Sequence, residues 1–216
     1  MLVRPEKRPR ALKSVIRMLG HARAPSVLGL IITYLMMSMP LDSYATEKHA
    51  SLEIFAGDRQ YTDAWKSDGF DAYAIDKRYD SAGECMNDIN SNIGFLHCLH
   101  KTLQTDLVSL MAPVCSTWVN LNSGTSGRSL GRPLGKGTSR NLEANKMVSR
   151  VLLLAWTCAA LGVCFIIEQP SGSWMEKHPR FQEFVKEHGL KRQYIEMKDF
   201  LIYPGWISGS LSQIFL

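Results

Sequence analysis

From Ser51 onward, short apolar runs alternate with amphipathic stretches, and this alternation constrains the fold more than any other feature of the chain. A short apolar run bounded by turn residues is typical of a buried strand. Strands that alternate with helices predict parallel strands joined by helical crossovers. The sequence therefore predicts an α/β protein with a mostly parallel sheet and helices on both faces.

The expected elements follow one another in chain order. Strands are expected at 52–55, 72–75, 107–111 and 163–167, with a weaker one at 193–197. Helices are expected at 61–67, 94–104, 142–160 and 178–188. A chain of 216 residues has room for one such domain and an appendage. We place that domain at 46–216.

Residues 1–45 form a basic leader, with seven Lys or Arg against two acids. This excess of five equals the net charge of +5 for the whole chain, so the domain itself is balanced. The leader contains an apolar run at 27–39, which is short for a bilayer span of about 20 residues. A targeting segment and a helix packed on the domain are both open. A nucleus or organelle is the expected location, with secretion or membrane association as alternatives.

The cysteines and histidines do not form a metal-binding pattern. The five cysteines include no CxxC pair, so neither a disulfide framework nor a zinc ribbon is predicted. His97 and His100 flank Cys98, but this stretch has no second ligand cluster. We therefore expect no bound metal.

Polar residues lie in or directly behind the apolar runs. Ligands of open α/β sheets bind at the carboxyl ends of the strands. Glu53 lies in the first run, and Asp76 follows the second. The third run leads to Cys115, and the fourth leads to Glu168. We expect these side chains to share one edge of the sheet.

Gly57 and Asp76 indicate a nucleotide-like ligand. A glycine directly after a strand permits a tight turn, and an acid 19 residues later stands where ribose hydroxyls are bound. Asp58 would repel a pyrophosphate. This disfavours NAD and FAD and fits S-adenosylmethionine, which carries no phosphate.

The motifs resemble those of the cytosine-5 DNA methyltransferases, within the wider class of S-adenosylmethionine-dependent methyltransferases. The stretch "LEIFAGDRQYTDAWKSDGFDAYAIDK" looks like the first two motifs, and "NDI" is similar to the third. "APVCSTW" resembles the Pro-Cys nucleophile motif, and "FIIEQP" resembles the Glu-Asn motif. Three positions differ from the family: Arg59 replaces a glycine, Val114 separates proline from cysteine, and Gln169 replaces asparagine.

The resemblance implies a Rossmann-like methyltransferase sandwich that binds S-adenosylmethionine. The implied cofactor contacts are Glu53, Phe55, Gly57, Asp76 and Asp88. Cys115 would attack carbon 6 of a flipped cytosine, while Glu168 protonates ring nitrogen 3, so that carbon 5 accepts the methyl group. By the same comparison the chain is expected to be truncated at its C-terminus, with a possible partner chain that supplies target recognition.

A long basic loop is expected at 120–141. It contains Arg128, Arg132, Lys136 and Arg140 and no acid. Long loops inside compact domains are usually functional or disordered, and a cationic loop suits a phosphate backbone. We expect it to bind DNA, with RNA as the alternative partner, and to provide an electropositive setting for a Cys115 thiolate. A merely solvated loop is the alternative.

Three functions remain open at this point. The first is a methyltransferase that acts on cytosine in DNA through Cys115 and Glu168. The second is a catalytically inactive module of the same fold, with a binding or structural role. The third is a methyltransferase with a different acceptor, in which Cys115 only packs.

Overall fold

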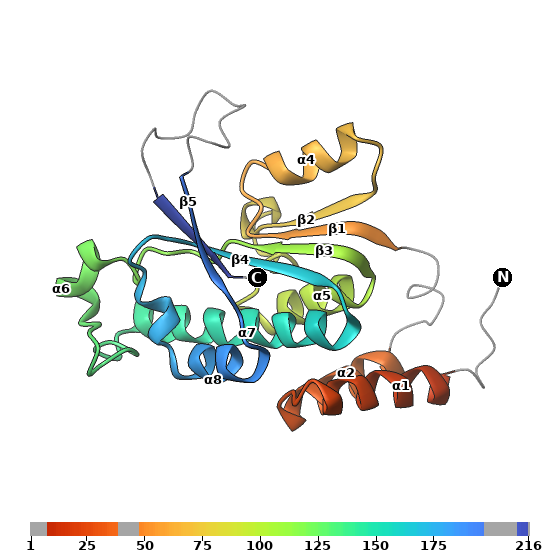
Figure 1. The fold of residues 1–216 in the computed structure, drawn as a ribbon. Helices are drawn as coiled ribbons and strands as arrows, with labels where there is room; N and C mark the ends of the chain where they lie inside the picture. The colour runs from red at the N-terminus through yellow and green to blue at the C-terminus, as the bar shows by residue number, and fades with distance from the viewer. Residues whose placement is uncertain (1–7, 39–47, 197–210, 216) are drawn as a thin grey trace. The chain divides into compact units, whose positions relative to one another are not determined.

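The computed structural model describes residues 8–38, 48–196 and 211–215 (Figure 1). Its α-helices are α1 Arg8–His21, α2 Ser26–Ser38, α4 Gln60–Ser67, α5 Asn92–Leu103, α6 Ser123–Ser126, α7 Ser139–Leu161 and α8 Pro179–His188. Short 3-10 helices are η2 Lys77–Tyr79, η3 Asn120–Asn122 and η4 Trp174–Lys177. The strands are β1 His49–Ile54, β2 Ala72–Ile75, β3 Thr105–Met111, β4 Cys164–Pro170, β5 Arg192–Glu196 and β6 Leu211–Phe215.

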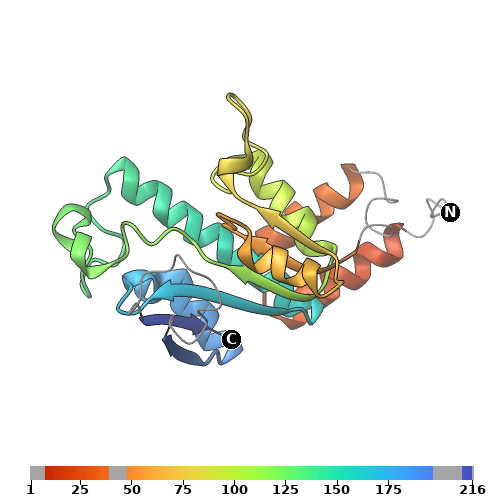
Figure 2. The ribbon, with the colours of Figure 1, turned by 90° about the horizontal axis from the view of Figure 1, so that it is seen from above.

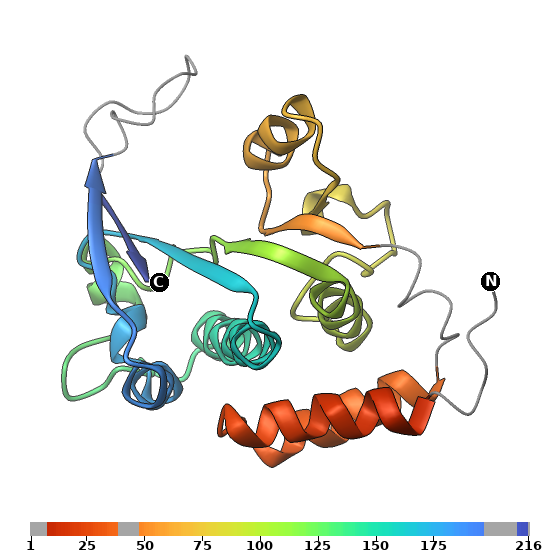
Figure 3. The same cartoon turned by 45° about the vertical axis from the view of Figure 1, so that its right-hand side comes forward.

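The strands form one sheet in the order β2-β1-β3-β4-β6-β5. Strands β2, β1, β3 and β4 are parallel, and β1 pairs with β2 from Ser51 opposite Ala72 to Ile54 opposite Ile75. Strand β6 runs antiparallel to both β4 and β5. Helices α4 and α5 cover opposite faces of the sheet at β1 (Figure 3). The predicted α/β class with a parallel sheet is therefore confirmed.

The chain divides into two compact units. The first unit comprises Met1–Leu110 and Leu153–Phe165. The second comprises Met111–Leu152 and Ile166–Leu216.

In the first unit, buried strand residues form the core. Leu52, Ile54 and Ile75 are almost fully buried because their strands are covered by helices on both faces. Helix α5 begins where the Ser91 hydroxyl accepts a hydrogen bond from the Gly94 amide. Gly94 lies so close to the Asp88 carbonyl that a side chain at this position would collide with it. This close approach fixes the loop that carries Asp88 to the start of α5.

The apolar run of the leader forms α2, which packs with α1 as a helical pair in the first unit (Figure 2). Leu28, Ile32, Leu35 and Met36 of α2 are buried. Trp156 of α7 donates an indole hydrogen bond to the Ala22 carbonyl between the two helices, at 3.0 Å. Residues 26–38 are thus a packed helix. Among the described helices, none combines the length and apolar character that a bilayer crossing requires.

In the second unit, α8 packs its aromatic face inward. Phe181 and Phe184 are fully buried, and the Phe181 ring meets Phe215 of β6 edge to face at 4.8 Å. The helix begins at Pro179, and the His178 side chain caps it by accepting a hydrogen bond from the Arg180 amide. The left-handed Gly189 ends it.

Most predicted elements are confirmed, with shifted boundaries that have local causes. Strand β1 ends at Ile54 because Phe55 adopts a left-handed conformation, with φ of 68°. Strand β4 extends to Pro170 because β6 pairs with it from Ile167 to Pro170. Glu168 therefore lies within the strand, where the sequence placed it directly after the strand. The predicted strand at 193–197 is β5, and Met197 lies outside the described residues.

The predicted single loop at 120–141 is wrong in part. It contains η3, the single helical turn α6 and the first residues of α7. A backbone bridge also joins Ser129 and Arg132. The segment is therefore a folded connection whose chain is fixed at several points.

Candidate functional site

The turn between β1 and α4 is the most strained backbone among the described residues of the first unit. Phe55, Gly57 and Arg59 have φ of 68°, 53° and 59°. Left-handed backbone costs a non-glycine residue about 1–2 kcal/mol, so the surrounding contacts must hold the turn. The Gly57 amide donates to the Asp76 carboxylate at 2.9 Å, and the Tyr79 hydroxyl donates to the Gly57 carbonyl at 2.8 Å. The end of β2 thereby holds the turn after β1.

Asp76 is placed beside Gly57, as the sequence predicted. It directly follows β2, and its second carboxylate oxygen accepts a hydrogen bond from the Arg78 amide at 2.8 Å. Its side chain is only 13% exposed. One carboxylate thus joins the ends of two neighbouring strands at the carboxyl edge of the parallel sheet.

Glu53 in β1 is hydrogen-bonded to the first turn of α4. One of its carboxylate oxygens accepts hydrogen bonds from the Thr62 amide at 2.9 Å and from the Thr62 hydroxyl at 2.6 Å. Burial raises the pKa of Glu53, while the two hydrogen bonds from Thr62 oppose that shift. Because the side chain is buried in β1, it stabilises the start of α4 and positions the turn above it.

Phe55 and Asp88 are the other two predicted cofactor contacts. Phe55 is half-buried in the turn itself. Asp88 lies in the loop before α5, where its carboxylate accepts a hydrogen bond from the Asn90 amide at 2.8 Å. Within the described residues, no hydrogen bond or ion pair joins Asp88 to Gly57 or Asp76. The structure therefore brings Gly57 and Asp76 together and holds Asp88 by separate contacts.

In the second unit, Cys115 follows β3 in a tight turn. Its carbonyl accepts hydrogen bonds from the amides of Trp118 at 2.7 Å and Val119 at 3.2 Å. The side chain is half-buried. Burial raises the pKa of Cys115, and the negative charge of Glu168 raises it further.

The direction of this shift differs from the sequence-based expectation for Cys115. The arginines of the neighbouring loop were expected to lower the thiol pKa, yet the shift is upward. The thiol is therefore protonated near neutral pH in the free protein. Any nucleophilic role requires a group that takes up its proton.

Gln169 has a positioning role that the sequence did not reveal. Its side chain is fully buried, and its amide nitrogen donates to the Pro113 carbonyl at 2.5 Å. Its amide oxygen accepts a hydrogen bond from the Ser173 hydroxyl at 2.9 Å. Gln169 thus ties the segment before Cys115 to β4, beside Glu168. Only the match to the amide of the Glu-Asn motif hinted at this position.

Arg128 is buried, which runs against its predicted contact with a phosphate backbone. It is 2% exposed, and its guanidinium donates to the Thr117 and Pro133 carbonyls at 2.9 and 2.6 Å. It also donates to the side chains of Asn145 and Thr117 at 3.0 and 3.2 Å. Burial lowers the pKa of Arg128 to about 10, so it remains charged at neutral pH. Through these hydrogen bonds the buried Arg128 stabilises residues 120–141, the basic segment.

The other three predicted nucleic-acid contacts are exposed. Arg132 and Arg140 lie on the surface, as does Lys136, whose ammonium donates to the Gly124 carbonyl at 2.8 Å. The segment around them is fixed, because Asn141 donates from its buried side chain to the Ser126 carbonyl at 2.7 Å. These cations therefore project from a folded surface.

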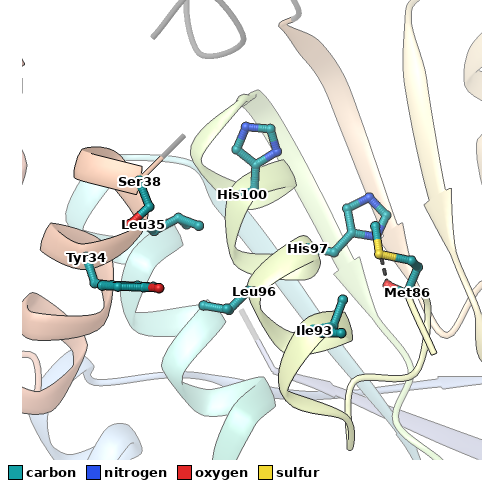
Figure 4. A pocket seen from close by; sticks show the side chains of 8 residues that line it. All are labelled: Tyr34, Leu35, Ser38, Met86, Ile93, Leu96, His97 and His100. Atoms are coloured by element: carbon teal, nitrogen blue, oxygen red, sulfur yellow. Dashed lines mark hydrogen bonds between the residues drawn. The ribbon is translucent and has the colours of Figure 1, made fainter. Parts of the chain in front are cut away.

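A separate pocket lies in the first unit between α2 and α5 (Figure 4). It has a volume of about 280 Å³ and a mostly apolar lining that includes Tyr34, Leu35, Ile93 and Leu96. His97 borders it, with one ring nitrogen 2.9 Å from the Met86 carbonyl. No predicted site residue lines this pocket. No group of three or more His, Cys, Asp or Glu side chains in the described parts of the chain is arranged to hold a metal ion.

These features define an α/β protein with four parallel strands in the order 2-1-3-4 and polar residues at the ends of the strands. No family model, curated protein or solved structure matches the chain. Its function is therefore argued from the site residues themselves.

Proposed function

We propose that this protein is an S-adenosylmethionine-dependent methyltransferase of the cytosine-5 type, with Cys115 as nucleophile and Glu168 as its acid-base partner. The observation that carries this proposal is the buried Gln169, which follows Glu168 in β4 and donates a hydrogen bond to the Pro113 carbonyl, so that the segment leading to Cys115 is tied to the strand that carries Glu168. A thiol and a carboxylate are the two functional groups that this chemistry requires. The Rossmann-like methyltransferase architecture is part of the same proposal.

The turn after β1 supports cofactor binding in the first unit. Gly57 has no side chain of its own that would keep a ligand from the backbone, and Asp76 lies beside it, where the family motif implies a bound ribose. Arg59 replaces a glycine of the family motif, yet it keeps the left-handed conformation that glycine favours, with φ of 59°. The substitution therefore leaves a left-handed residue at this position of the turn. S-adenosylmethionine would supply the methyl group.

The acid-base chemistry follows from the raised thiol pKa. Transfer of the Cys115 proton to Glu168 leaves a thiolate and a neutral carboxylic acid. The thiolate then adds to carbon 6 of the base, while the acid protonates nitrogen 3, which balances the charge on the ring. Because the transfer neutralises Glu168, it also removes the negative charge that opposed thiolate formation.

The exposed cations support a nucleic-acid partner. Arg132, Lys136 and Arg140 belong to a stretch that contains no acid from residue 107 to residue 142. Such a surface gains affinity from phosphate contacts and loses it with added salt. A base inside a duplex is out of reach of a cysteine, so the target must be extruded or single-stranded.

Covalent trapping tests this proposal. The protein is incubated with S-adenosylmethionine and DNA that contains 5-fluorocytosine, which blocks release of the enzyme after methyl transfer. We expect an adduct that withstands denaturing electrophoresis and is lost in Cys115→Ser. The matched control, Cys164→Ser, replaces an exposed cysteine and should leave the adduct intact. An adduct in Cys115→Ser, or none in the unaltered protein, overturns the proposed chemistry.

A second candidate function is a binding module of the same fold without turnover. The raised pKa of Cys115 favours it, because working nucleophilic cysteines usually have lowered pKa values. Calorimetry with S-adenosylhomocysteine separates the two candidates. Binding that Asp76→Ala weakens, together with an absence of any trapped adduct, identifies the module.

A further inference from the structure

The side chain of Arg78 covers the turn at Gly57. A Cβ atom added to Gly57 would meet the Arg78 guanidinium, so the charged group lies directly against the glycine. The same guanidinium is 3.5 Å from the Asp58 carboxylate and 3.6 Å from the Asp76 carboxylate. Arg78 therefore contacts Gly57 and Asp76, the two residues on which the proposed cofactor site depends.

A ligand needs the same space. A glycine behind a strand serves ligand binding because nothing projects from its Cα, which lets a ligand approach the backbone. In this structure a guanidinium occupies that face of Gly57 and also lies beside the ribose-binding position of Asp76. A ligand and Arg78 cannot both occupy this position.

We propose that Arg78 is a displaceable cover, which closes the adenosyl site of the free protein and swings out when a ligand binds. This inference rests on the proposed cofactor site and adds a regulatory contact to it. The cover is weakly held. Both charge contacts exceed normal hydrogen-bond length, and the Arg78 side chain is 57% exposed, where water and salt screen ion pairs.

If Arg78 covers the site, two effects on the affinity for a neutral ligand such as adenosine are expected. Removing Arg78 abolishes the competition, so Arg78→Ala should bind adenosine about threefold to tenfold more tightly, as expected for the loss of weak exposed ion pairs. Raising the salt concentration screens the same pairs, so the unaltered protein should gain affinity with salt. The affinity of Arg78→Ala should change little with salt.

Calorimetric titration with adenosine at low and high salt tests the cover. Lys77→Ala is the matched control, because it removes an exposed neighbouring cation that makes no ion pair with Asp58 or Asp76 in the described structure. Asp58→Asn leaves Arg78 in place but removes one of its partners, so its affinity should lie between those of the unaltered protein and Arg78→Ala. Circular dichroism of each variant verifies folding.

The outcomes distinguish a failure of the Arg78 proposal from a failure of the proposed cofactor site. Tighter binding by Arg78→Ala, with no change in Lys77→Ala, supports the cover. Equal binding by all variants overturns the cover and leaves the cofactor site standing. Weaker binding by Arg78→Ala also overturns it, because Arg78 then contacts the ligand. Absence of adenosine binding in every variant overturns both the cover and the adenosyl site.

Discussion

The guanidinium carbon of Arg128 lies 3.3 Å from the centre of the Trp118 ring, and both residues are buried. This stacked pair stabilises the connection between β3 and α7, because the same guanidinium also satisfies backbone carbonyls at Thr117 and Pro133. A cation on an aromatic face gains more when both are shielded from water. The charged side chain of Arg128 therefore stabilises the fold of the basic segment to which it belongs.

Replacing Arg128 should destabilise the protein strongly. Arg128→Met keeps much of the volume but leaves buried carbonyl groups without donors, so we expect a loss of about 3 kcal/mol in the free energy of unfolding. Urea denaturation measures it. Arg132→Met, at an exposed position of the same segment, should cost less than about 0.5 kcal/mol. Equal costs for the two variants would contradict the structural role of Arg128.

The reactivity of Cys115 should depend on Glu168. Burial raises the pKa of the Cys115 thiol and the Glu168 charge adds to this shift, so Glu168→Gln should lower that pKa and increase the thiolate fraction at a fixed pH near 8. Alkylation by iodoacetamide, followed for the Cys115 peptide by mass spectrometry, should then be faster in Glu168→Gln. Glu183→Gln, an exposed position on α8, is the control and should leave the rate unchanged. A slower rate in Glu168→Gln would refute the interaction.

The placement of residues at the carboxyl ends of the parallel strands was predictable from the sequence, because it follows from the strand assignments. Parallel strands present their carboxyl ends at one edge, so the sequence could place Gly57 and Asp76 at the same edge once both strands were assigned, and the pairing of β1 with β2 brings them together. Their hydrogen bond of 2.9 Å confirms this. The alternation of apolar runs and helical patterns carried that information.

The burial of Arg128 and the strand β6 were not predictable in the same way. An arginine in a stretch rich in glycine and serine looks exposed, and only the Trp118 ring and the Asn145 side chain on α7 reveal its interior position. Strand β6 has little local signal, and its pairing with β4 and β5 defines it. Tertiary contacts decide both features, and no local pattern encodes them.

Gly57→Ala should separate stability from ligand binding. The backbone at Gly57 has φ of 53°, and an added Cβ would displace only the end of the exposed, flexible Arg78 side chain, so an alanine there should cost about 1 kcal/mol of unfolding free energy. Gly69→Ala is a matched control, because Gly69 has φ of 85° and an added Cβ meets nothing within 4 Å. Both variants should lose similar stability in urea, but only Gly57→Ala should weaken calorimetric binding of S-adenosylhomocysteine. Equal binding by both would place the ligand elsewhere.

His178 should make the protein less stable as the pH falls. Burial, together with the charges of Arg180 and Arg128, lowers the pKa of His178 to about 4. An unfolded histidine titrates near about 6.5, so the group is neutral in both states above that pH. Between about pH 6.5 and pH 4, His178 is protonated in the unfolded chain but remains neutral in the folded protein. The free energy of unfolding therefore falls by about 3 kcal/mol over this range.

The substitution His178→Asn isolates this effect from other titrating groups. Asparagine is also a good N-cap, so the start of α8 keeps an acceptor for the Arg180 amide. Loss of the edge contact with Trp118 lowers stability at every pH and leaves the slope unaffected. Urea unfolding of both proteins from pH 7.5 to pH 4 should therefore show curves that converge as the pH falls. Parallel curves would mean that His178 accepts its proton in the folded state, and that its burial beside Trp118 and the two arginines does not govern its charge.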